Sequence, residues 1–189
     1  MPTTTTDAAK FVDVTAKMSL VMALLGVVYS LLQLGTIVVV GWLSPRQWLA
    51  EHDLPLPASW NWWADHALAL GVACLVASLA FLVVSWGLLK RQPWSRVGLI
   101  AFLIVVALAN FACLPLVDAF FSGLLATLPA DVADDPELLQ AMSQFHVTRW
   151  VTLLMSAVAC LAIAALHGWM VIKLGRAPVR AVFNGSGQR

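Results

Sequence analysis

Asp118 and Arg149 are two opposite charges at the edges of long apolar stretches of this chain, residues 97–121 and 147–173. Charges near a membrane are costly unless they are paired or hydrated, and they often mark a path for ions, protons or substrates. The pair therefore indicates an outward-facing polar site. The alternative interpretations are that the two residues form a structural salt bridge, or that they are unrelated and each extends its charge to water.

His66 and His146 also lie at the ends of apolar stretches, at similar expected depth. Two histidines on facing helices could hold a haem or contribute to a metal site, although both positions are interfacial rather than buried. His167 lies deep in an apolar stretch, six residues before Lys173. It could relay protons or contact a quinone, or it could form a hydrogen bond across a helix bundle.

Asn110 lies five residues before Pro115 in the third apolar stretch. Proline removes the backbone hydrogen bond to the carbonyl of Phe111, which predicts a kink in the helix. The freed carbonyl needs a donor, and we expect Asn110 or a neighbouring helix to supply it.

The sequence lacks the motifs of the common enzyme classes. It has no glycine-rich phosphate loop, no His-Glu-x-x-His, no Gly-x-Ser-x-Gly and no Cys-x-x-Cys. We therefore expect a non-enzymatic protein without a resident cofactor or metal.

The apolar stretches that must position these residues dominate the composition. Of 189 residues, 61% are hydrophobic and 11% are charged, against about 25% charged in soluble domains. A helix needs about 20 apolar residues to cross a bilayer. The sequence therefore predicts one all-α transmembrane domain over residues 1–189, an antiparallel four-helix bundle. The expected spans are 18–42, 66–90, 97–121 and 147–173, and the external segments, with short interfacial helices, are 43–65 and 122–146.

Charge asymmetry predicts the orientation of this bundle. Only Arg46 and Arg149 fall on one side of the expected spans, and nine basic residues fall on the other. Because basic residues stay on the cytoplasmic side, both termini are expected there. The nine residues are Lys10, Lys17, Lys90, Arg91, Arg96, Lys173, Arg176, Arg180 and Arg189. They are too scattered for a nucleic-acid site.

The outer helices are expected to extend beyond the bilayer. A cap near Thr6 predicts a helix that continues into the first span, and a short interfacial helix is expected at 46–53. Asp135 and Pro136 predict a helix start for the fourth helix. From 136 to about 173 it would measure roughly 57 Å, so it projects outward or bends near residues 144–148.

Small and weakly polar residues recur on one face of three expected helices, which is typical of packing between helices in lipid. These residues are Ala23, Gly26 and Ser30 in the first, Ala67, Gly71, Cys74, Ser78 and Ser85 in the second, and Arg149, Thr152, Ser156, Cys160, Ile163 and His167 in the fourth.

The pattern favours a multi-pass accessory or scaffolding subunit that acts through helix contacts with another membrane protein or a second copy of itself. The alternatives are a small transporter or channel component that uses Asp118 and Arg149, or a redox subunit that holds haem or quinone through its histidines. The compact chain and the absence of targeting signals favour a bacterial inner membrane as its location.

Overall fold

The computed structural model describes residues 5–43, 47, 58–125 and 136–184, and within these ranges the chain is all-helical, as expected. Four long apolar helical segments have the length and composition needed to cross a membrane, which indicates a multi-pass membrane protein. The described helices are α1 (Thr5–Trp42), α3 (Ala58–Leu89), α4 (Pro93–Ala112), α5 (Leu114–Leu125), α6 (Pro136–Gly175) and α7 (Ala177–Asn184).

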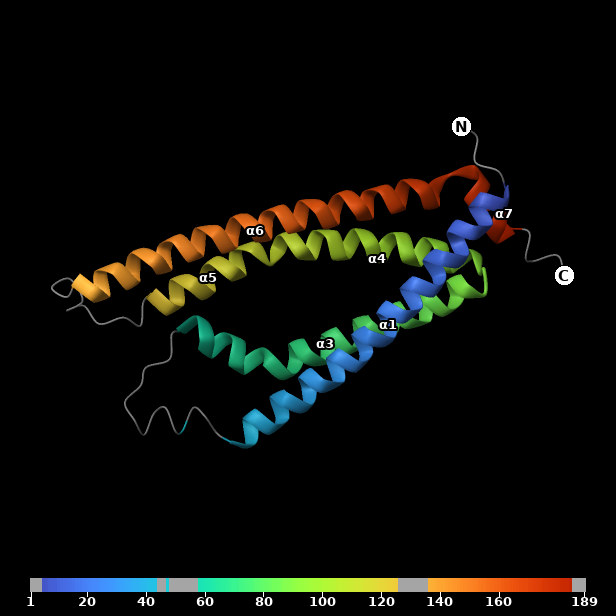
Figure 1. Ribbon diagram of the computed structural model, residues 1–189. Helices are drawn as coiled ribbons and strands as arrows, with labels where there is room; N and C mark the ends of the chain where they lie inside the picture. The colour runs from blue at the N-terminus through green and yellow to red at the C-terminus, as the bar shows by residue number, and fades with distance from the viewer. Residues whose placement is uncertain (1–4, 44–46, 48–57, 126–135, 185–189) are drawn as a thin grey trace.

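The helices form two arms that are joined at one end (Figure 1). α1 packs along α3 in one arm, and α4 and α5 pack along α6 in the other. A tight turn links α3 to α4, in which Arg91 has a left-handed backbone (φ 55°) and Gln92 N–H donates to the Gly87 carbonyl at 2.9 Å. We call the joined end the terminal end, because the described chain begins and ends there. At the opposite end, the far end, α3 approaches α5 again.

The buried core lies at the terminal end, where α7 packs against α1 and α6. The sequence analysis did not predict α7. Its signals are Pro178 in the first helical turn and apolar residues at Val179, Val182 and Phe183. Phe183 is 1% exposed. α7 is therefore an amphipathic helix whose apolar face covers the core at this end of the bundle. The buried residues around it are Ala8, Val12, Ala16, Leu88, Leu99, Leu103, Leu174 and Val179.

The expected small-residue seam is present between α1 and α3. The Ser30 and Ser78 hydroxyls lie 3.2 Å apart, and Gly71 is buried against Leu34 of α1. Cys74 does not belong to this seam, because it lies at the edge of the stripe and is exposed.

Two helix extents agree with the sequence analysis and two differ. α1 begins at Thr5 and α6 at Pro136, as expected. α6 is unbroken through residues 144–148 and measures about 60 Å. α3 begins eight residues before the expected span and α5 continues to Leu125, so the segments between these helices are shorter than the expected 43–65 and 122–146. Apart from the helical Gln47, the interfacial helix expected at 46–53 lies outside the described residues.

Candidate functional site

Asp118 of α5 and Arg149 of α6 form an ion pair near the far end. Arg149 donates from Nε to Asp118 Oδ1 at 2.8 Å and from Nη2 to the same oxygen at 2.5 Å. The Arg149 side chain is 22% exposed and the Asp118 side chain 42%. Two residues that are 31 positions apart in the sequence thus meet between two helices, at a point that solvent or lipid can reach.

This pair keeps unused hydrogen-bonding capacity. A guanidinium has five N–H donors and a carboxylate has two acceptor oxygens. Both bonds of Arg149 end on Oδ1, so Asp118 Oδ2 and three N–H groups of Arg149 take no part in them. The ion pair can therefore bind a further anionic group and a further donor at once.

A break between α4 and α5 sets the position of Asp118. Cys113 ends α4, and its carbonyl accepts hydrogen bonds from the N–H groups of Leu116 and Val117, each at 3.1 Å. Pro115 lies in the first turn of α5, where its missing N–H costs least. The predicted proline effect is present, and it separates the third span into two helices.

Asn110 does not have the role that the sequence analysis gave it. Its Nδ2 donates to the Val106 carbonyl at 2.9 Å, and the Phe111 carbonyl accepts from backbone N–H at the C-terminal cap of α4. A neighbouring helix supplies a donor to a different carbonyl: Cys160 of α6 donates from Sγ to the Asn110 carbonyl at 3.3 Å. Because backbone N–H at the cap already donates to the Phe111 carbonyl, that carbonyl needs no hydrogen bond from a side chain.

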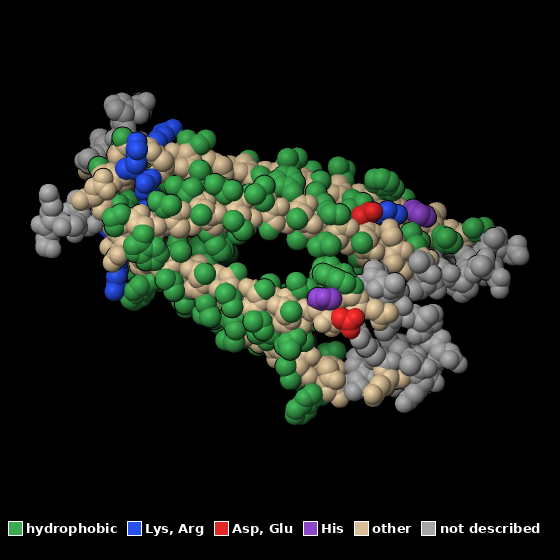
Figure 2. Space-filling model, turned by 180° about the vertical axis from the view of Figure 1, so that it is seen from behind, with side chains coloured by type: hydrophobic (Ala, Val, Ile, Leu, Met, Phe, Trp, Pro, Cys, Tyr) green, Lys and Arg blue, Asp and Glu red, His purple; other side chains and the backbone are tan. Residues whose placement is uncertain are grey.

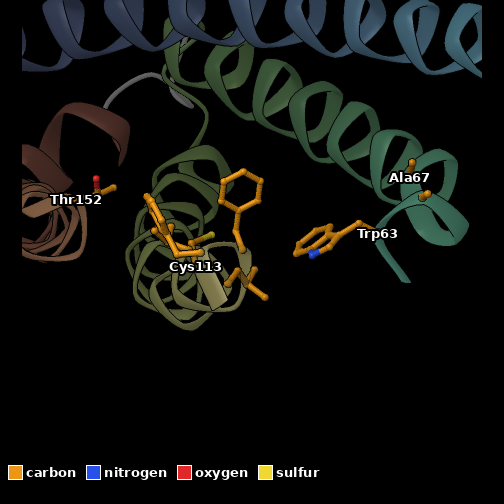
Figure 3. A pocket seen from close by; sticks show the side chains of 9 residues that line it. Trp63, Ala67, Cys113 and Thr152 are labelled. Carbon is orange, nitrogen blue, oxygen red and sulfur yellow. The ribbon is translucent and has the colours of Figure 1, made fainter. Parts of the chain in front are cut away.

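An apolar cleft of about 820 Å³ lies beside the ion pair. One wall is the start of α3, with Trp63 and Ala67, and the other is α5, with Val117 and Phe121. Figure 3 shows the Trp63 indole pointing from α3 across the cleft, and Thr152 of α6 on the opposite side. The space-filling view shows an opening between the arms that hydrophobic side chains frame, with charged and histidine side chains beyond it (Figure 2).

The cleft and the ion pair are neighbours along α5 and α6, although neither charged residue lines the cleft. Val117 and Phe121 line the cleft on either side of Asp118 along α5, and Thr152 lies one helical turn from Arg149 on α6. Sequence reasoning missed this cleft, because its walls come from helices of different arms, and a single sequence does not give the spacing between them. The sequence feature that could have indicated an apolar site here is the Phe120-Phe121 pair near the end of an expected span.

The outer histidines lie on different arms. His66 of α3 is exposed, stacks on Trp62 with ring centroids 4.6 Å apart, and has Nδ1 2.9 Å from the Trp62 carbonyl oxygen. His146 is exposed on α6, and α5 lies between these two helices (Figure 1). Within the described ranges, no three His, Cys, Asp or Glu residues cluster in a way that could hold a metal ion. The structure therefore does not place the two histidines on packed, facing helices.

His167 lies on the inward stripe of α6, where the sequence analysis placed it. Its Nδ1 is buried and has no hydrogen-bond partner among the described residues, and the same is true of Ser85 Oγ. The expected hydrogen bond across the bundle is therefore not formed at Nδ1.

Comparison of the chain with protein-family models, with curated proteins and with solved structures finds no match.

Proposed function

We propose that the chain is a four-span cell-membrane protein with antiparallel spans and both termini in the cytoplasm, and that it acts as a non-enzymatic accessory subunit through helix contacts. The orientation rests on the nine basic residues of the terminal end and its loop. The contact surface is the face of α1 turned away from α3. It includes Met22, Leu25, Tyr29 and Leu32, all of them exposed.

The observation that carries this proposal is the position of Tyr29. Its side chain is 68% exposed. It lies twelve residues after Lys17 and thirteen before Trp42, which is about 18 Å from either end of the span. A tyrosine side chain is too short to bring its hydroxyl from there to water.

A hydroxyl at that depth needs a protein partner. Lipid chains offer no hydrogen bond, and an unpaired hydroxyl in an apolar medium costs several kcal/mol (about 4–8 on a cyclohexane scale). No described residue of the chain bonds to the Tyr29 hydroxyl. A helix of another membrane protein, or of a second copy, would satisfy it and would cover the exposed face of α1.

Photo-crosslinking in membranes tests this proposal. A photoreactive phenylalanine analogue at Tyr29 is expected to give a discrete protein adduct. The same analogue at Val158, an exposed apolar position on α6, is expected to label lipid. An adduct at twice the chain mass of 20.4 kDa would identify a second copy. If position 29 labels only lipid, the proposal is wrong.

A second candidate function is a transporter or channel component. The observation in its favour is that Asp118 and Arg149 pair beside an open cleft. Asp118→Asn should then change solute or proton flux in liposomes that contain the protein, and an unchanged flux would remove this candidate.

A further inference from the structure

The depth of the cleft follows from the tryptophans at the terminal end. Trp94 of α4 and Trp169 of α6 are exposed there, at the level that indoles prefer, the membrane interface. The hydrocarbon core takes about 20 helical residues. Counted toward the far end, that distance reaches Leu114 on α4–α5 and Arg149 on α6. The ion pair therefore lies at the outer headgroup level, and the cleft crosses that level: Cys113 and Thr152 lie on its hydrocarbon side, and Phe120 and Phe121 lie on its water side.

An apolar hollow at this depth takes up a lipid chain. Apolar cavities do not hold water, and this one is an open cleft with an almost entirely apolar lining. Its volume of about 820 Å³ is within the range of sites that enclose small hydrophobic ligands, about 300–1,000 Å³. A partner helix fits less well, because helices associate in lipid through small residues, and Trp63, Phe120 and Phe121 project into the cleft.

The ion pair adds a requirement on the headgroup. The three remaining N–H groups of Arg149 match a phosphate, and Asp118 Oδ2 matches an ammonium that can donate hydrogen bonds. A primary amine donates such bonds, whereas a quaternary choline cannot. The anionic headgroup of phosphatidylglycerol carries no ammonium group that could pair with Asp118. Charge complementarity thus selects a zwitterion with a primary amine.

We propose that the cleft between α3 and α5 is a binding site for an aminophospholipid of the outer leaflet, with its headgroup on Asp118 and Arg149 and its chain against Ala67, Cys113 and Thr152; the choice of leaflet rests on the orientation proposed above. The site uses the far ends of α3, α5 and α6. It is therefore independent of the partner proposed at Tyr29, which lies on the outward face of α1.

Native mass spectrometry of the delipidated protein in mild detergent tests this site. The probes are phosphatidylethanolamine, phosphatidylcholine and phosphatidylglycerol with identical acyl chains. Phosphatidylethanolamine is expected to bind about tenfold more tightly than the other two, which corresponds to one charge-assisted hydrogen bond. The double variant Asp118→Asn, Arg149→Gln should lose this preference and should still bind all three lipids through the cleft.

A second pair of variants tests the chain-binding part and does not disturb the charges. Ala67→Trp fills the cleft and should abolish most of the bound phosphatidylethanolamine. Ala69→Trp is the matched control, because Ala69 is exposed on the same helix and is not among the cleft-lining residues. Equal binding of the three headgroups to the unmodified protein would overturn the proposal, and so would equal lipid loss in the two tryptophan variants. A protein adduct from a photoreactive group at position 67 would overturn it in favour of a partner helix.

Discussion

The indole of Trp94 covers Gly87 at the turn between α3 and α4. A methyl group added at Gly87 would lie 2.7 Å from Trp94 Cζ2 and 2.9 Å from Ser95 Cβ. The indole is itself fixed, because Trp94 Nε1 donates to Gln92 Oε1 at 2.9 Å. Glycine at this position therefore allows the close approach of α3 and α4 that closes the terminal end.

Gly87→Ala is expected to destabilise the protein by about 1–3 kcal/mol, the usual cost of overfilling a packed contact. Thermal unfolding in detergent measures this change. Gly168→Ala is the control, since nothing lies within 4 Å of the added methyl group. It should be neutral or slightly stabilising, because alanine favours a helix by about 0.5–1 kcal/mol over glycine. Equal melting temperatures for the two variants would contradict the close packing at Gly87.

The buried ring of Phe183 should make α7 essential to the fold. Phe183→Ala is expected to cost about 3–5 kcal/mol, because it removes a large ring from the core at the terminal end. Arg180→Ala on the exposed face of the same helix should change stability by less than about 0.5 kcal/mol. The comparison is made by thermal unfolding, and a mild effect at Phe183 would mean that the core does not depend on α7.

The hydroxyl contact between α1 and α3 has a defined direction. Ser30 Oγ donates to the Gly26 carbonyl at 2.8 Å, so Ser78 must be the donor in the contact with Ser30. Ser78→Ala removes that donor and leaves Ser30 bonded within its own helix. We expect a cost of about 0.6 kcal/mol, typical of hydrogen bonds between membrane helices.

Ser78→Leu should be far more harmful than Ser78→Ala, because it overfills the seam where Gly26 approaches Ser78. The measurement is the separation of α1 from α3, read from crosslinking yield between cysteines placed on the two helices. A leucine variant that crosslinks as efficiently as the alanine variant would show that the seam is not closely packed.

Features set by local sequence were predictable. Apolar length predicted the four long helices, an Asp-Pro pair predicted the start of α6, and Pro115 predicted a kink, which the structure has as a break after Ala112. A salt bridge between Asp118 and Arg149 was one of the alternatives that their positions left open, and it is formed. Each of these signals is contained in one helix or follows from its length.

Features set by the spacing between helices were not predictable. Cys74 lies at the edge of a small-residue stripe, and the neighbouring helix leaves it exposed. The cleft also depends on how the start of α3 faces α5, which belongs to the other arm. Asn110 bonds within its own helix because the cap geometry of Cys113 already satisfies the neighbouring carbonyl. A single sequence does not give the distances between helices on which these features depend.

The ion pair itself should stabilise the contact between α5 and α6 modestly. Asp118→Asn and Arg149→Gln, made singly and together, give a double-mutant cycle that isolates the pair. Because both side chains are partly exposed, we expect a coupling energy of about 1 kcal/mol or less. The coupling should fall as salt rises from about 0.1 M to 1 M, since the Debye length shrinks from about 10 Å to 3 Å. A coupling that high salt leaves unchanged would place the pair in a dry environment, closed to the headgroup region, and would contradict its role as a polar site at the mouth of the cleft.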